Sequence, residues 1–318
     1  MCGIVGLVAA RDASPPDARA LERAVAALRH RGPDGHGTYL QRAAALGHTR
    51  LSIIDPEGGA QPLANEDGSV VVVFNGEIWN HLRLRRLLEG AGHRFRTRAD
   101  TEVIVHGYEQ WQDEVVDHLD GMFAFAIWDA RRERLLLARD RVGKKPLHVA
   151  HLDRGLAFGS DVRALLLAAE QTPALDEANV PEFLFQRYVG GDRSLFRGVK
   201  RVLPGELLVY DRERLSHRRY WQLQPSQEPH RLAAGSLRTL LRGAVEERLM
   251  SDVPLGVLLS GGVDSAAVLG LMREAGADSV ASFTIGFDNP LYDERARARA
   301  AARLHGSDHH EILVSPSD

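Results

Sequence analysis

The 318-residue chain contains a single cysteine, Cys2, and only three lysines, Lys144, Lys145 and Lys200. One thiol cannot form an intramolecular disulfide, so the sequence excludes a disulfide-stabilised scaffold and is typical of a reducing, cytoplasmic environment. No apolar run approaches the roughly 20 residues that a membrane-spanning helix needs. The formal net charge is −3. This near balance of charge predicts neither nucleic acid nor an acidic membrane surface as a partner.

The first part of the chain alternates short apolar runs with helical patterns. Apolar residues at helical spacing, Leu21, Val25 and Leu28 and again from Val103 to Trp111, predict two helices. The β-branched and aromatic runs between Gly, Asp or Asn residues predict strands at 4–8, 45–48, 70–74, 123–128, 135–139 and 156–159. Paired strands with interposed helices favour a layered α+β domain, which we place at residues 1–222.

A polar segment with two prolines separates this domain from a second one. Residues 224–230 lack any periodicity, so we predict a linker at 223–232. Residues 233–318 begin with an amphipathic helix over Leu237–Leu249. Predicted strands at 257–259, 280–285 and 310–314 then alternate with predicted helices at 263–275 and 293–304. This order predicts the start of a parallel, doubly wound α/β sheet.

Cys2 directly follows the initiator methionine. Methionine aminopeptidases remove Met1 when the next residue is small, and the mature chain would then begin with a residue that carries both a thiol and an α-amine. The ordinary pKa of an α-amine is about 8, so this amine could accept the thiol proton near neutral pH. The residue alone also fits a buried small hydrophobe or an acylation site.

Three further motifs in the first domain place polar or charged groups at the ends of predicted strands or at the start of a predicted helix. Arg50 ends a predicted strand, where its guanidinium group could hold a carboxylate through two hydrogen bonds. Asn75-Gly76-Glu77 offers a carboxamide, a backbone amide and an acid directly after a β-run. Asp100 lies at a predicted helix start, where helix capping is the alternative role. The turn at 30–35 by itself fits a plain surface loop.

Taken in order, these motifs resemble the class II glutamine amidotransferases. The resemblance rests on Cys2-Gly3-Ile4, Arg31-Gly32-Pro33-Asp34, Arg50-Leu51-Ser52-Ile53, Asn75-Gly76-Glu77 and Asp100. It implies the amino-terminal-nucleophile hydrolase fold, an αββα sandwich, and attack by Cys2 on glutamine. Asn75 and Gly76 would form the oxyanion hole, Arg50 would hold the substrate α-carboxylate, and Glu77 and Asp100 would receive its α-ammonium group. The implied substrate-binding residues are Arg50, Leu51, Ser52, Ile53, Ile54, Asn75, Gly76, Glu77 and Asp100.

The second domain contains a glycine-rich loop, Leu258–Ser265, between a predicted strand and a predicted helix. Glycines let the backbone approach a phosphate, and the start of a helix favours negative charge. No Gly-Lys-Ser/Thr closes the loop, so it is not a Walker A motif, and a tight turn is the alternative. The loop resembles the pyrophosphate loop of enzymes that cleave ATP between the α and β phosphates. That resemblance implies that Ser260, Gly261, Gly262 and Ser265 hold pyrophosphate, that Asp264 binds Mg²⁺, and that Leu259 and Ile285 line the nucleotide pocket.

The order of the two domains resembles the asparagine synthetases that hydrolyse glutamine. Arg139–Leu147 is similar to a segment near the interdomain face in that family. The resemblance implies ATP and Mg²⁺ as cofactors and glutamine, aspartate and ATP as partners. Members of that family continue for hundreds of residues more, so we expect a truncated synthetase that acts only as a glutaminase. Another carboxylate acceptor, a non-enzymatic glutamine-binding remnant and assembly as a homodimer all stay open.

Overall fold

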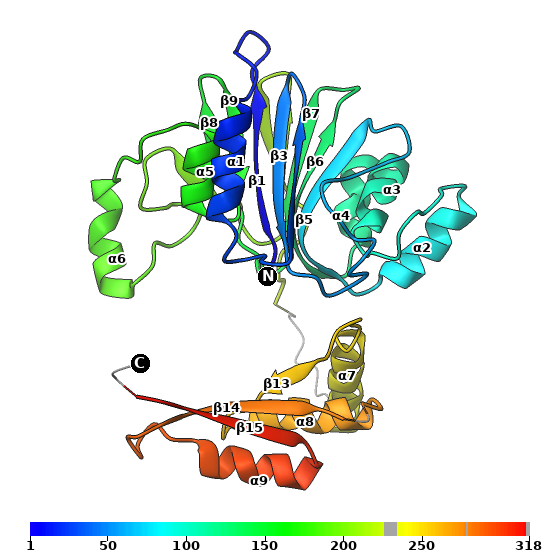
Figure 1. Ribbon diagram of the computed structural model, residues 1–318, viewed down its shortest axis with the longest axis vertical. Coiled ribbons are helices and arrows are strands. Elements are labelled where there is room, and N and C mark those ends of the chain that lie inside the picture. Colours follow the sequence, from blue (N-terminus) through cyan, green and yellow to red (C-terminus); the bar gives the residue numbers. More distant parts are fainter. Residues whose placement is uncertain (226–233, 278, 316–318) are drawn as a thin grey trace. The chain divides into compact units, whose positions relative to one another are not determined.

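The computed structural model describes residues 1–225, 234–277 and 279–315. The chain divides into two compact units, Met1–Gln224 and Pro225–Asp318, shown in Figure 1. Most of the predicted linker, 223–232, falls outside the described residues. Within the described ranges, no helix is both long enough and apolar enough to cross a membrane.

The first unit contains two antiparallel sheets, each with six strands among the described residues. The first sheet has the spatial order β10-β8-β9-β1-β3-β2. Its strands are β1 (Gly3–Ala9), β2 (Gly35–Leu40), β3 (Ala44–Arg50), β8 (His148–Leu152), β9 (Gly155–Gly159) and β10 (Val199–Arg201). The second sheet has the order β12-β11-β7-β6-β5-β4. Its strands are β4 (Leu63–Ala64), β5 (Val70–Ile78), β6 (Gly121–Asp129), β7 (Arg134–Arg139), β11 (Glu206–Asp211) and β12 (Arg214–Arg219).

Helices cover the outer face of each sheet, and the two inner faces form a shared apolar core (Figure 1). Helices α1 (Ala18–Ala27) and α5 (Val162–Ala168) pack on the first sheet. Helices α2 (His81–Gly90), α3 (Glu102–Trp111) and α4 (Val115–His118) cover the second. Strand β5 contributes to two cores because alternate residues face opposite sides: Val71 and Val73 lie between the sheets, and Val72 and Phe74 lie under the helices. The predicted αββα sandwich is confirmed.

Shorter elements complete the first unit. They are the single-turn 3₁₀ helices at Gln112–Glu114 and Glu177–Asn179 and helix α6 (Val180–Gln186). All six strands predicted from the sequence are present, while β2, β4, β8, β10, β11 and β12 were not predicted.

The second unit begins, among the described residues, with helix α7 (Ala234–Glu247). Strands β13 (Gly256–Leu258), β14 (Ala281–Phe287) and β15 (Asp308–Val314) form a parallel sheet in that order. Helices α8 (Val263–Glu274) and α9 (Arg295–His305) connect them. The core contains Leu259, Leu269, Met272, Val280, Ala298 and Ala302. The predicted start of an α/β sheet domain is confirmed.

Candidate active site

The ends of β1, β3 and β5 meet at a cavity of about 190 Å³ in the first unit. Its walls contain every residue that the sequence predicted for glutamine except Ser52, whose amide instead donates to the Asp34 carboxylate at 2.8 Å. The lining residues are Met1, Cys2, Arg50, Leu51, Ile53, Ile54, Gly59, Gln61, Phe74, Asn75, Gly76, Glu77, Ala99, Asp100, Thr101, Met122 and Lys145.

Cys2 lies half-buried immediately before β1 and lines the cavity. The Leu51 amide donates to the Cys2 Sγ at 3.4 Å, and the Arg31 Nε donates to the Cys2 carbonyl at 3.1 Å. Burial raises the pKa of the Cys2 thiol, and the Leu51 amide offsets part of that effect. Because the thiol is therefore mostly protonated at neutral pH, it needs a base before it can act as a nucleophile.

The amides of Phe74 and Ile78 in β5 both point to the cavity side of the strand. Phe74 donates to the Gln61 Oε1 at 2.7 Å, and Ile78 donates to the Asp100 Oδ2 at 2.9 Å. Gly76 lies between them, two residues from each, so the period of two in a strand turns its amide to the same side.

The register with β6 supports this direction for the Gly76 amide. Gly76 lies opposite Phe123. Asp140 directly follows β7, the other neighbour of β6. The Phe123 amide donates to the Asp140 Oδ2 at 3.2 Å, and the Phe123 carbonyl accepts from the Asp140 amide at 2.8 Å. In an antiparallel sheet such a residue forms a non-hydrogen-bonded pair with its other neighbour. The Gly76 N–H is therefore directed away from β6, toward the cavity.

Two properties of the sequence at 75–76 match this close packing. A Cβ atom on residue 76 would lie 2.1 Å from the Met122 carbonyl oxygen, so only glycine fits. The side chain of Asn75 is 1% exposed, and neither its Nδ2 nor its Oδ1 has a hydrogen-bond partner in the described part of the chain. A buried carboxamide without partners is destabilising by about 1–3 kcal/mol, so this one is available for a ligand.

Arg50 ends β3, and its guanidinium group lies within a short loop. It donates to the carbonyl oxygens of Ile54 (3.1 Å), Asp55 (2.6 Å) and Pro56 (2.7 Å). A Cβ atom at Gly59 would lie 2.3 Å from the Arg50 Nη2, so any larger residue there would displace the guanidinium group. Three of the five N–H donors of Arg50 thus hold the loop, and the others can bind a carboxylate at the cavity wall.

Two acids face the same cavity. Burial raises the pKa of Asp100 to about 7, although the Ile78 amide favours the charged form, and the nearby Glu77 raises the pKa further. Burial also raises the pKa of Glu77, which Lys145 partly offsets. Asp100 does not cap α3 with its side chain in the way that the alternative reading required, since its Oδ2 bonds to β5.

Sequence reasoning missed three polar residues of the cavity, Gln61, Thr101 and Lys145. The Gln61 carboxamide joins β5 to the start of α3, because it accepts from the Phe74 amide and donates to the Thr101 hydroxyl at 3.3 Å. No periodicity or motif distinguishes Gln61 in the sequence. Lys145 lies in a segment that the sequence comparison related to an interdomain face, and the structure places its side chain in the cavity.

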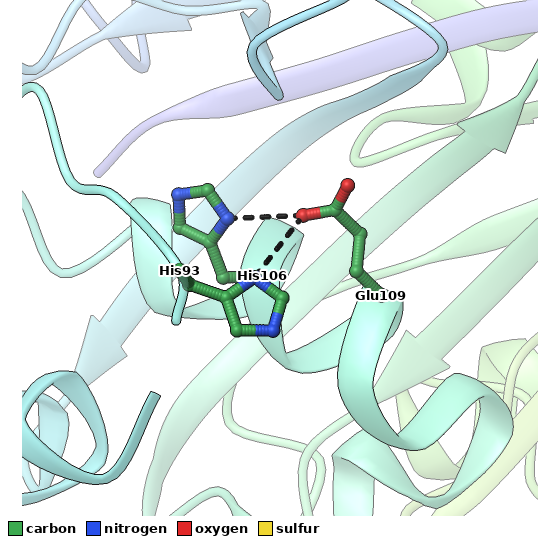
Figure 2. Close-up of side chains that lie close together, drawn as sticks. All are labelled: His93, His106 and Glu109. Atoms are coloured by element: carbon green, nitrogen blue, oxygen red, sulfur yellow. Dashed lines mark hydrogen bonds and ion pairs between the residues drawn. The ribbon is translucent and has the colours of Figure 1, made fainter. Parts of the chain in front are cut away.

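A separate cluster consists of His93 and two residues of helix α3, His106 and Glu109 (Figure 2). The Glu109 Oε2 lies 3.0 Å from the His106 Nδ1 and 3.6 Å from the His93 Nδ1. The His106 Nε2 lies 3.6 Å from Glu102. Burial lowers the pKa of His106, but its bonds to Glu102 and Glu109 outweigh this and raise it to about 9. At neutral pH, His106 is thus an imidazolium ion between two carboxylates.

The Glu102 side chain connects this cluster to the segment that precedes α3. It accepts hydrogen bonds from the amides of Arg96 and Thr97, each at 2.8 Å, and from the Thr97 hydroxyl at 2.7 Å. Burial raises the pKa of Glu102, but bonds from His106 and Thr97 outweigh this and lower it to about 2. These contacts fasten the segment before α3, which carries Asp100 to the cavity wall.

In the second unit, the glycine-rich loop is held together by hydroxyl groups. The Ser260 Oγ and Ser265 Oγ lie 2.9 Å apart, and the Ser265 Oγ accepts from the Ser260 amide at 3.1 Å. Gly262 precedes the first residue of α8. The loop therefore presents hydroxyl groups and the start of a helix, the donors that a phosphate needs.

The remaining predicted residues of this loop differ in exposure. Asp264 is exposed, and Ile285 is half-exposed. The side chain of Leu259 is only 2% exposed because it packs in the core of the unit, so this side chain does not line an open pocket. Arg297 of α9 lies beside the loop, since a Cβ atom at Gly261 would be 2.8 Å from its Cβ; the sequence analysis did not single out this arginine.

Comparison with known proteins agrees with this fold and site. A family model described as a glutamine amidotransferase domain matches residues 1–221. That match covers more than half of the chain, so the chain belongs to the glutamine amidotransferase family. A second model, described as asparagine synthase, matches residues 236–318. The chain thus carries a glutamine amidotransferase domain followed by a segment that matches the asparagine synthase model.

Curated relatives extend the match across both units. The chain is 31% identical over 340 residues to asparagine synthetase [glutamine-hydrolyzing] 3 of Bacillus subtilis (strain 168), which covers 100% of this chain and 55% of that protein. It is 36% identical over 322 residues to asparagine synthetase [glutamine-hydrolyzing] 2 of Oryza sativa subsp. japonica, covering 98% and 49%. The chain spans about half the length of the curated relatives it matches.

A solved structure supports the fold. Glutamine phosphoribosylpyrophosphate amidotransferase from B. subtilis, complexed with ADP and GMP, superimposes with a TM-score of 0.51 at 18% identity. The superposition covers 98% of this chain and 65% of that one.

Proposed function

We propose that the first unit hydrolyses glutamine to glutamate and ammonia, with Cys2 as the nucleophile. The observation that carries this proposal is the convergence of three groups on one cavity: the Cys2 thiol, the partnerless Asn75 carboxamide and the Gly76 amide. A nucleophile beside two hydrogen-bond donors is the arrangement that acyl transfer requires.

The chemistry divides into two displacements. After removal of Met1, the α-amine of Cys2 takes the thiol proton, and Sγ attacks the side-chain carbonyl carbon of glutamine. The Asn75 Nδ2 and the Gly76 N–H stabilise the oxyanion. Collapse breaks the C–N bond, the amine returns the proton, and ammonia leaves a γ-glutamyl thioester. Water then attacks the thioester, releasing glutamate and restoring the thiol.

The charged groups of the cavity fit the other end of glutamine. Arg50, already fixed by three carbonyl oxygens, would bind the α-carboxylate with its remaining donors. Glu77 and Asp100 would bind the α-ammonium group. This arrangement would let the enzyme discriminate glutamine from amides that lack a charged α-amino acid end.

For the complete protein we propose glutamine-dependent asparagine synthesis, in which ammonia amidates an aspartyl adenylate formed from ATP. The names of the relatives and the hydroxyl-lined loop at Ser260–Ser265 support this proposal. The exposed Asp264 carboxylate beside that loop fits one Mg²⁺ ligand, since Mg²⁺ is usually held by one or two carboxylates and the substrate phosphates. The ion would neutralise phosphate charge. A cytoplasmic location and a homodimer also stay proposals.

Glutamate release by the chain tests the glutaminase assignment. Purified protein with and without Met1 is incubated with glutamine, and glutamate and ammonia are quantified. We expect equal amounts of the two products from the processed chain and essentially none from Cys2→Ala or from chain that retains Met1. The matched control is Ser52→Ala, a residue at the same loop whose side chain does not line the cavity. A Cys2→Ala protein as active as the parent would refute the assignment.

A second experiment distinguishes aspartate from other carboxylic acids as the acceptor of ammonia. Pyrophosphate release from ATP is measured with aspartate and with other carboxylic acids of similar size, using the longest natural form of the protein. Dependence on aspartate supports asparagine synthesis, whereas dependence on another acid assigns a different amidotransferase.

A further inference from the structure

Lys145 has an unusual position for a lysine. Lys145 is only 7% exposed, and it lines the same cavity as Cys2 and Glu77. The preceding residue, Lys144, is exposed. Lysine is almost never fully buried unless it is paired, because an ammonium ion is costly to remove from water. In the described ranges, no carboxylate lies within ion-pair distance of the Lys145 ammonium group. A structural ion pair therefore does not explain its burial.

The loop that carries Lys145 is held by the buried carboxylate of Asp140. Its Oδ1 accepts from the amides of Val142 (3.2 Å) and Lys144 (2.9 Å), and its Oδ2 accepts from the Lys145 amide (3.0 Å). Asp140 is completely buried. Three amides bound to one carboxylate fix the course of this loop over residues 142–145.

Arg139 holds the same loop from the carbonyl side. It donates to the carbonyl oxygens of Gly143 and Lys145, each at 2.7 Å, and to that of Val202 at 2.7 Å. Gly143 has a φ of +69°, a conformation that favours glycine. These bonds hold the backbone of Lys145 in one place. The position from which its side chain extends into the cavity is therefore fixed.

The charged groups around Cys2 come from several elements. They are the amino terminus of the chain and the side chains of Arg31, Asp34, Arg50, Glu77, Asp100 and Lys145. Arg50 is engaged with loop carbonyls, and Arg31 donates to the Cys2 carbonyl. Among the three cationic side chains of this group, Lys145 is thus the one for which no such hydrogen bond of the charged end is found in the described part of the chain.

We propose that Lys145 is a positioning residue that keeps the Cys2 thiol and the adjacent α-amine in their reactive protonation states. A nearby cation stabilises the thiolate, and it disfavours a second cation at the amine. Both effects lower a pKa, that of the thiol and that of the amine, so each group loses its proton at a lower pH. The amine is therefore unprotonated near neutral pH and can act as a base. In the unprocessed chain the terminal amine belongs to Met1, and it is subject to the same kind of effect. Burial lowers the pKa of that amine, Cys2 raises it, and Lys145 and Arg31 lower it further.

The reactivity of the thiol tests this role without any substrate. The rate of Cys2 alkylation by iodoacetamide is measured against pH on the Met1-processed chain without glutamine. Cys2 is the sole cysteine, so the signal has one source. We expect Lys145→Ala and Lys145→Met to move the midpoint of the profile upward by about one pH unit. Lys145→Arg should restore the parent profile, and the neighbouring Lys144→Ala should coincide with the parent.

Steady-state kinetics supply the second readout, which rests on the proposed hydrolysis of glutamine. The acidic limb of kcat/KM should move upward by the same amount in Lys145→Ala, with KM at high pH unchanged. Coincident alkylation profiles of the parent, Lys145→Ala and Lys145→Met would overturn the inference, provided that circular dichroism shows folded protein. A parent that alkylates normally yet releases no glutamate would instead refute the proposed function, so the two failures are distinguishable.

Discussion

The carboxylate of Asp100 accepts a hydrogen bond from the backbone amide of Ile78 at 2.9 Å. Ile78 lies two residues beyond Gly76 on the same strand. One substrate-facing acid is therefore attached directly to the strand that presents the oxyanion donors. The distance between the charged end of a bound glutamine and its reacting amide is set within a single rigid element, rather than between two mobile loops.

This attachment predicts how glutamine binding depends on pH. Because burial raises the pKa of Asp100 to about 7, its charged form increases as the pH rises through that value. Only the charged form attracts the substrate ammonium group, so KM for glutamine should fall between about pH 6 and pH 8. In Asp100→Asn, KM should be higher and should lose this pH dependence. Initial-rate measurements in buffers of constant ionic strength check it; an unchanged pH dependence in the variant would contradict the role.

Asn75 should act on the rate rather than on binding. Replacing Asn75 by Asp keeps the shape of the side chain and removes the Nδ2 donor. The loss of one oxyanion donor lowers kcat by about 10²–10³. Titration of glutamine with parent and variant gives kcat and KM separately. We expect KM to change little, and a variant with raised KM and unaltered kcat would show that Asn75 binds the ground state.

Arg50 and Gly59 should have matching kinetic effects. Arg50→Ala removes the proposed carboxylate donors, so KM should rise about tenfold or more while kcat changes less. Gly59→Ala places a methyl group 2.3 Å from the Arg50 Nη2 and should displace the guanidinium group, raising KM in the same way. Gly68→Ala serves as the control for adding a methyl group, because it meets no neighbouring atom, although its φ of +73° adds some backbone strain. A fall in kcat at constant KM in Arg50→Ala would refute the proposed binding of the α-carboxylate by Arg50.

His106 should stabilise the first unit in a pH-dependent manner. Its pKa is about 9 in the folded protein and about 6.5 when unfolded. The stabilisation is thus fully present below about pH 6.5 and is lost as the pH rises through 9. His106→Ala should lower the free energy of unfolding by roughly 3 kcal/mol near pH 6, because it removes the imidazolium ion between two largely buried carboxylates. Urea unfolding at pH 6 and above pH 9 measures the difference, which should shrink at the higher pH; an equal difference at both would exclude an imidazolium ion.

The sequence predicted the inner strands of the sandwich but not its margins. Strand β5 contains four consecutive valines with strong β propensity. Edge strand β12 is rich in arginine, and β2 contains two glycines, so neither shows an apolar alternation. These strands form because a neighbour supplies backbone partners, and that information is not local.

Site residues that stand in short recognisable motifs could be predicted from the sequence. Site residues that reach the cavity only through tertiary contacts could not. Cys2, Arg50 and Asn75-Gly76 stand in recognisable runs. The direction of the Gly76 amide follows from its register with Phe123, which no local pattern contains. Lys145 enters the cavity only because Asp140 and Arg139 bend its loop.

The partnerless carboxamide of Asn75 also limits how stable this domain can become. Replacing it with leucine, whose side chain branches at the same atom, would remove two unsatisfied polar atoms from the interior. It should strengthen the folded state if the larger methyl groups are accommodated, while ending oxyanion stabilisation. A screen for heat-resistant variants would therefore tend to select inactive ones at this position. At this position, folding stability and catalytic rate therefore oppose each other. A bound substrate that bonds to the carboxamide would remove the cost in stability, but only while it is bound.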